Sequence, residues 1–146
     1  MDRNVVLTIR GLHAGGETED GSLETVIKAE YFKKGGTHYL LYEEEQEGFP
    51  QPLKSRIKYK DRVLELTRQG LIETHIIFEQ GKKTMSRYAV PYGEMTLGVE
   101  TSEVRMEEWK DSLKIQAEYD LEIDGEHQAH SRIEIFATEE NGTANP

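Results

Sequence analysis

The chain has no cysteine, and this absence excludes several kinds of chemistry. Disulfide bridges, thiolate metal sites, iron–sulfur clusters and cysteine nucleophiles all need that residue. Long apolar runs are also missing, since the longest span only a few residues against the roughly 20 that a membrane-spanning helix needs. Met1 leads directly into a strand pattern without the apolar core of a signal peptide. We therefore expect a cytoplasmic protein with no membrane partner.

Positive charge is scarce relative to negative charge. The chain carries 18 Lys and Arg against 28 Asp and Glu, which gives a formal net charge of −10. Because phosphate backbones and anionic lipids repel such a chain, we expect no nucleic-acid partner. A length of 146 residues predicts one domain, which we place at residues 1–138, followed by a flexible polar tail at residues 139–146.

What the chain has in abundance is alternation of apolar and polar residues. Such alternation runs through residues 113–123, and it resumes after Asp124-Gly125 up to residue 137. Successive side chains of a strand face opposite sides, so these are strands with one buried face, and Asp-Gly suits the tight turn of a hairpin. Similar stretches occupy residues 5–10, 23–31, 37–45, 53–59, 63–68, 72–78, 85–90 and 95–101. Their short connections predict an all-β fold, a single antiparallel up-and-down β-barrel of about eight to ten strands.

Turn glycines, a proline and strand aromatics recur in five segments of the chain: residues 34–45, 63–70, 78–81, 88–93 and 119–125. In the content and order of these segments the chain resembles the YwiB-like family of uncharacterised bacterial proteins, over residues 5–136. The resemblance implies a calycin-like (lipocalin-like) β-barrel and a bacterial cytoplasmic setting. It implies no assigned activity, and no functional residue is carried over from it.

The leading functional hypothesis is a barrel that binds a small amphipathic or anionic molecule in its lumen or at its mouth. Arg68 and Arg87 each share a strand face with apolar residues, which favours an inward orientation for each, and the hypothesis takes at least one of them to lie in the lumen. A buried arginine must be paired or must bind an anion. Tyrosines and a histidine on the strands are further candidates for the wall of the same cavity: Tyr42, Tyr88, Tyr119 and His38. We predict no cofactor, no metal site and no established catalytic residue.

A basic stripe occupies one strand, with a cation at every second position: Lys54, Arg56, Lys58 and Lys60. This spacing places all four side chains on one face, and we expect an outer face paired with acidic residues on neighbouring strands. The stripe and Trp109 are also the candidate surfaces for an alternative function. In that alternative the barrel is filled by side chains and acts as a protein-interaction module, for example as a homodimer.

A third hypothesis is a divalent-ion-dependent phosphate hydrolase. It would use Arg68, Arg87 and a lumenal carboxylate, either Glu65 or Glu94. The histidines offer little support for a metal, because His127 and His130 are three positions apart. In a regular strand that spacing places two side chains on opposite faces, where they cannot hold one ion together.

Overall fold

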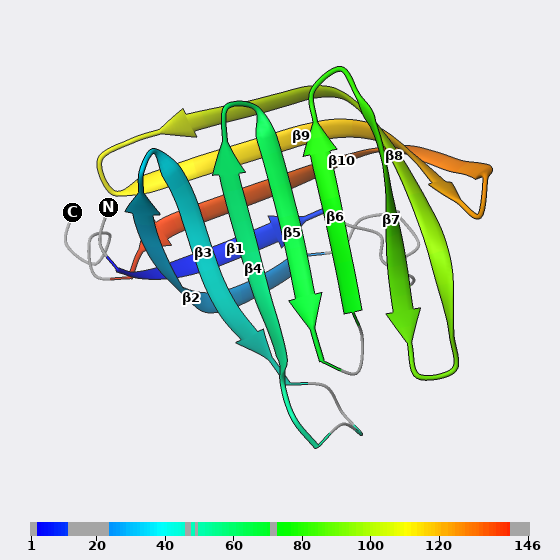
Figure 1. Cartoon of the computed structure of the whole chain (residues 1–146). Helices are drawn as coiled ribbons and strands as arrows, with labels where there is room; N and C mark the ends of the chain where they lie inside the picture. The colour runs from blue at the N-terminus through cyan, green and yellow to red at the C-terminus, as the bar shows by residue number, and fades with distance from the viewer. Residues whose placement is uncertain (1–2, 12–23, 46–47, 49, 71–72, 141–146) are drawn as a thin grey trace.

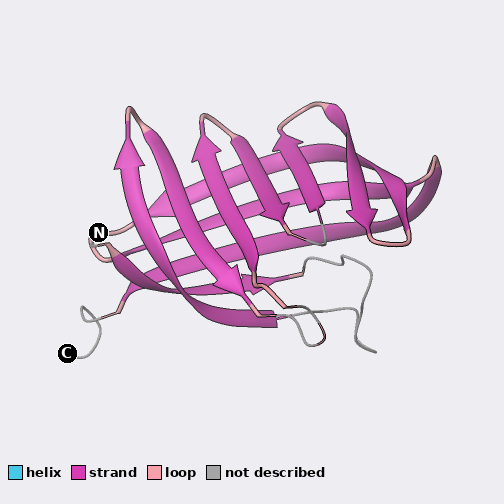
Figure 2. Ribbon diagram, turned by 60° about the horizontal axis from the view of Figure 1, so that its bottom comes forward, coloured by secondary structure: helices cyan, strands magenta, loops and turns pink. Residues whose placement is uncertain are grey.

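The computed structural model describes residues 3–11, 24–45, 48, 50–70 and 73–140, and these residues form ten strands. In chain order the strands are β1 (Asn4–Arg10), β2 (Glu24–Lys34), β3 (Thr37–Glu44), β4 (Leu53–Lys60), β5 (Val63–Gln69), β6 (Glu73–Glu79), β7 (Lys83–Val90), β8 (Gly93–Glu108), β9 (Ser112–Ile123) and β10 (Glu126–Glu139). Figure 2 shows strands and loops and no helix over this described part of the chain. Accordingly, no helix among these residues has the length and apolarity to cross a membrane. Most of the predicted tail, residues 141–146, lies outside the described residues.

The ten strands close into one antiparallel barrel. Each strand pairs with its neighbours in sequence, and β1 pairs with β10 to complete the circle (Figure 1). This arrangement confirms the predicted all-β, up-and-down barrel. A closed meander of this kind leaves fewer unpaired strand edges than an open sheet.

Two of the tight turns have the same backbone conformation, which the sequence predicts for one of them, Asp124-Gly125. Asp124 and Gly125, between β9 and β10, have φ angles of 51° and 86°. Asp61 and Arg62, between β4 and β5, have φ angles of 52° and 66°. Positive φ at both central residues is typical of the hairpin turn whose twist matches that of the strands. Arg62 occupies this conformation without being glycine, which is unfavourable for a residue with a Cβ atom.

Alternate residues of every strand point into the barrel and form one apolar core. Leu64 on β5 lies in register with Phe78 on β6, and both side chains are fully buried. Phe78 meets Tyr119 of β9 edge to face, with their ring centroids 4.9 Å apart. Such aromatic pairs add to the stabilisation from burial alone. This part of the lumen is therefore filled by side chains.

At two places in the barrel, neighbouring strands pair over only part of their length. β2 pairs with β3 only from Glu30 to Lys34, and its earlier residues pair with β1 alone. β2 and β3 consequently diverge toward the lower right of Figure 1. The pairing of β6 with β7 is also short, with two registered pairs, Glu73–Ala89 and Thr74–Tyr88. The first of these two openings lies beside the polar part of the lumen.

Candidate ligand-binding site

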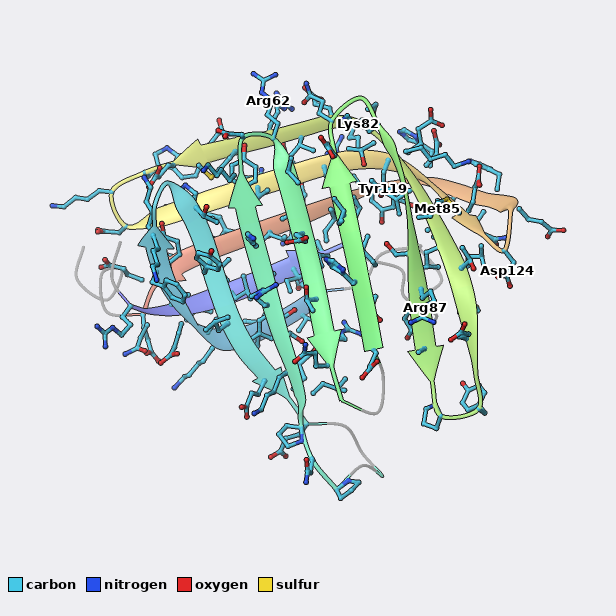
Figure 3. The ribbon with its side chains drawn as sticks, in the orientation of Figure 1. Arg62, Lys82, Met85, Arg87, Tyr119 and Asp124 are labelled. Atoms are coloured by element: carbon cyan, nitrogen blue, oxygen red, sulfur yellow. The ribbon has the colours of Figure 1, made fainter. Side chains whose placement is uncertain are left out.

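Arg68 and Arg87, which the sequence pattern treats alike, differ in burial, although both reach one outer cleft of about 800 Å³. Arg68 is in register with the buried residues Ser55 and Thr74 on the inner face, and its side chain is 24% exposed. The Arg87 side chain is 76% exposed, and its Nη1 atom lies 3.6 Å from Glu94 Oε2. The inward prediction is therefore wrong for Arg87. Its neighbour Met85 is apolar but also faces outward, 58% exposed, so it marks the wrong face (Figure 3).

Arg68 lines a cavity of about 120 Å³ in the lumen. Since one water molecule occupies about 30 Å³ of liquid, the cavity has room for about four. Its walls combine polar and apolar side chains, among them Tyr42, Glu44, Thr74, Ile9, Leu66 and Ile76. The lumen is therefore packed in one part and hollow in another.

Two charged groups of opposite sign face this cavity without touching. The Nε atom of Arg68 lies 3.9 Å from Oε1 of Glu44, which is too long for a hydrogen bond. Glu44 Oε1 is buried, and no described group lies within hydrogen-bonding distance of it. The same holds for the hydroxyl of Thr74, a residue that is 8% exposed. Buried polar groups are nearly always hydrogen-bonded, so these atoms have unused capacity for a polar molecule.

Tyr42 lies between the inner cavity and a larger cleft that opens to solvent. Burial and the negative charge of Glu44 raise the pKa of the Tyr42 hydroxyl to about 12, against the opposing effect of Arg68. The hydroxyl is therefore protonated at neutral pH and is available as a donor. The Tyr42 side chain lines both the inner cavity and a larger cleft beside it.

The larger cleft has a volume of about 600 Å³ and lies where β2 and β3 diverge. Both of the diverging strands line the cleft, β2 with Ala29 and β3 with Tyr42. Charged residues of both signs, such as Lys28, Glu43 and Lys54, line its outer part. The cleft and the inner cavity together fall in the size range of small-molecule sites, which are clefts of about 300–1,000 Å³.

Comparison with known proteins places this barrel in a family. A family model described as a domain of unknown function (DUF1934) matches residues 7–135. The chain belongs to the DUF1934 family. The uncharacterised β-barrel protein YwiB of Bacillus subtilis (strain 168) is 26% identical over 136 residues, covering 90% of this chain and 93% of YwiB. The crystal structure of the YwiB protein from Bacillus subtilis matches with a TM-score of 0.77 at 21% identity, over 94% of this chain and 92% of that one. The predicted family resemblance is confirmed, and the structural match supports the barrel fold.

Three of the predicted ligand residues lie in the packed part of this DUF1934 barrel instead. Tyr119 is 2% exposed, and burial raises the pKa of its hydroxyl to about 12. His38 is buried, with its Nδ1 atom 2.8 Å from the Tyr31 hydroxyl, and burial lowers its pKa. Tyr88 is buried as well. None of the three lines the inner cavity, so of the six predicted ligand residues the structure places Arg68 and Tyr42 there.

The basic stripe lies on the outer face, as its spacing predicts. Lys58 Nζ is 3.9 Å from Glu65 Oε1 on the neighbouring strand, which matches the expected cross-strand pairing. Arg56 makes no ion pair or hydrogen bond with a described residue, and it lines the cleft beside Lys54. Lys60 is exposed. Trp109 is 49% exposed in the turn after β8. The end of β8 that precedes it lies beside the end of β4, since Val104 and Met106 line one hollow together with Tyr59 and Arg62.

The residues proposed for a hydrolase are not assembled in the lumen of the DUF1934 chain. Arg68 faces inward, whereas Glu65 binds His75 on the outer wall, with Glu65 Oε2 2.9 Å from His75 Nε2. Glu94 is more than half exposed beside Arg87. The set is therefore not gathered in the lumen, as the hypothesis expects, although Glu65, Arg68 and Arg87 all line one outer cleft of about 800 Å³.

Glu44 and Thr74 are among the cavity residues that the sequence-based predictions do not name. Glu44 belongs to a stretch rich in glutamate and proline that is typical of a solvated loop, yet it is the last residue of β3 and faces inward. The signal was present in the alternation, because His38, Leu40, Tyr42 and Glu44 occupy every second position. Thr74 shares its face of β6 with Ile76 in the same way.

A β-bulge overturns the prediction for His127 and His130. The register of β10 shifts between His127 and Ala129, so both histidines contact Asp120 on β9. His127 Nε2 lies 3.5 Å and His130 Nδ1 3.1 Å from Asp120 Oδ1, and these hydrogen bonds lower the pKa of Asp120. A bulge adds one residue to a strand and re-aims its side chains. Within the described residues, no three His, Asp or Glu side chains are arranged to hold a metal ion.

Proposed function

We propose that this DUF1934 protein binds a small amphipathic or anionic molecule. The polar group of the ligand would enter the inner cavity beside Arg68, and the remainder would lie in the cleft between β2 and β3. The observation that carries this proposal is an arginine side chain, 24% exposed, that makes no hydrogen bond with a described residue and lines a cavity.

Burial gives Arg68 its significance. A guanidinium has five N–H donors and stays charged at all physiological pH values. Removing it from water is unfavourable unless its donors and its charge are matched. Glu44 matches the charge only in part, because the 3.9 Å separation leaves the donors free. A carboxylate or phosphate oxygen next to Arg68 would provide the missing acceptors through charge-assisted hydrogen bonds.

Native mass spectrometry of gently purified protein tests the proposal. We expect a reproducible mass excess that disappears on denaturation, and we expect Arg68→Met to lose it. Arg87→Met is the matched control, since it removes an arginine from the outer face of the wall. This variant should keep the bound mass. A bare wild-type protein, or a mass excess that survives in Arg68→Met, would contradict the proposal.

A further inference from the structure

We infer that the ligand's polar group is zwitterionic, an amino carboxylate of the kind found in free amino acids. The inference rests on the proposed function and deepens it, because it concerns the same cavity. It comes from the pairing of Arg68 with Glu44 across a gap, rather than from Arg68 alone.

Next to each other, the cavity has an unused hydrogen-bond donor group and an unused hydrogen-bond acceptor. Arg68 has unused donors, and Glu44 Oε1 is a buried acceptor that receives no hydrogen bond from a described group. A simple anion would satisfy Arg68 but would bring a like charge to within contact of Glu44. A simple cation would have the opposite fault at Arg68. A group that carries both charges satisfies both residues at once, with a carboxylate on the guanidinium and an ammonium on the carboxylate.

The uncharged polar residues of the cavity also suit an amino carboxylate. Tyr42 and Thr74 both line the cavity and both carry a hydroxyl, and Thr74 Oγ1 has no described partner. Each can donate to a carboxylate oxygen or accept from an ammonium. Arg56 also lines the cavity, although it extends from the outer face of β4. Its additional positive charge favours an orientation with the carboxylate toward the arginines.

Size separates the polar group from the rest of the ligand. The inner cavity of about 120 Å³ holds about four waters. This is a suitable volume for a carboxylate, one carbon and an amino group. A larger side chain must extend past Tyr42 into the cleft of about 600 Å³, which Leu41 and Ala29 line together with charged residues of both signs. The structure thus assigns the polar group to the lumen and the variable part to the cleft.

Calorimetric titration with three sets of probes tests the inference. The first set is the free L-amino acids, the second is the same acids with N-acetylated amines, and the third is their methyl esters. We expect members of the first set to bind, and blocking either charge should weaken binding by at least about tenfold, because one buried charge is then left unpaired. Glu44→Gln should weaken the free acids and reduce their advantage over the N-acetyl acids. Arg68→Met should weaken both kinds of acid, and Arg87→Met should change neither.

The outcomes separate the inference from the proposed function. If N-acetyl acids bind as tightly as free acids, or if a bound molecule found by native mass spectrometry has no amino carboxylate, the zwitterion is wrong and ligand binding stands. If no probe binds and the native mass is bare, both are wrong. Binding of free amino acids that is unchanged in Arg68→Met would place the site elsewhere and overturn the inference. Circular dichroism of each variant confirms that it is folded before titration.

Discussion

The same strands build a packed part and a hollow part of one lumen. At one end of the β5–β6 pair, Leu64 lies opposite Phe78, and both are fully buried. At the other end of the same pair, Arg68 lies opposite Thr74 beside a cavity of about 120 Å³. The backbone pairing is the same at both ends. What differs is the volume and polarity of the side chains that point inward, so whether a small barrel is full or open is decided separately at each level along its strands.

The two parts also differ in where their unmatched polar atoms lie: those of the hollow part face a cavity, whereas Thr101 Oγ1 in the packed part lies beside none of the cavities described above. In the packed part, the buried His38 has the Tyr31 hydroxyl at 2.8 Å. In the hollow part, the oxygen atoms of Glu44 and Thr74 have no described partner. Interiors are usually both close-packed and satisfied in their hydrogen bonds. A region that departs from both rules at one place is where a ligand site is expected, and stability measurements can test whether the contrast is real.

The largest expected effect is in the packed part. Phe78→Ala should lower the free energy of unfolding by about 3–5 kcal/mol, because it removes a buried ring and leaves a cavity against Tyr119. Urea denaturation at neutral pH measures this change. A loss below about 1 kcal/mol would mean that this end of the lumen collapses freely. The contrast between the two ends would then disappear.

Two threonine-to-valine substitutions compare the effect on stability of a buried hydroxyl away from the cavities, that of Thr101, with a hydroxyl beside the inner cavity, that of Thr74. Thr101, in register with Tyr119, is 1% exposed with an unpartnered Oγ1 and lines none of the cavities described above. Thr101→Val should stabilise the protein by about 1–2 kcal/mol, because it removes a desolvated hydroxyl that has no hydrogen bond. Thr74→Val should change stability by less than about 0.5 kcal/mol, since water or ligand can reach the hydroxyl in its cavity. Equal effects in both variants, measured by urea denaturation, would argue against an accessible cavity.

Much of the fold follows from local rules. Alternation with a period of two marks each strand, and Asp124-Gly125 marks its turn, because both depend only on neighbouring residues. The up-and-down order follows from connections that are nearly all of hairpin length, because a crossover to a parallel strand needs a dozen residues or more. These features need no knowledge of distant contacts.

The site was only partly predictable, because it depends on which face of a strand is inside. Arg68 and Arg87 both have apolar neighbours, but Met85 beside Arg87 is itself exposed and Ala89 is half-buried. Glu44 falls at the end of a predicted strand, where its charge suggests an outer position, and the bulge near His127 reversed the face of one histidine relative to the expected alternation. In each case the deciding contact comes from another strand. The separation of β2 from β3, which forms the cleft, leaves no mark in either strand's own sequence.

The two arginines also differ in their expected contribution to stability. Arg68→Met should lower the free energy of unfolding by about 1 kcal/mol, because it leaves the partly buried Glu44 carboxylate without a cation. Arg87→Met should change it by less than about 0.5 kcal/mol, as is usual for an exposed ion pair. Denaturation of both variants in the same buffer provides the comparison. If the Arg87 variant were the less stable one, the assignment of inner and outer faces on β5 and β7 would be in error.

The smallest effect concerns the pH dependence of the packed part. Burial lowers the pKa of His38 below its ordinary value of 6.5, and Lys33 acts in the same direction while Glu108 opposes both. As the pH falls below that value, the unfolded chain takes up a proton before the folded one does, so the stability contributed by neutral His38 is lost. His38→Gln should remove this component, so that the difference in stability between the wild type and the variant shrinks between about pH 8 and about pH 5. Urea denaturation across that range measures the difference. If the difference instead grows in acid, Glu108 outweighs burial, and the end of the barrel that holds His38 is more open to charge than its packing indicates.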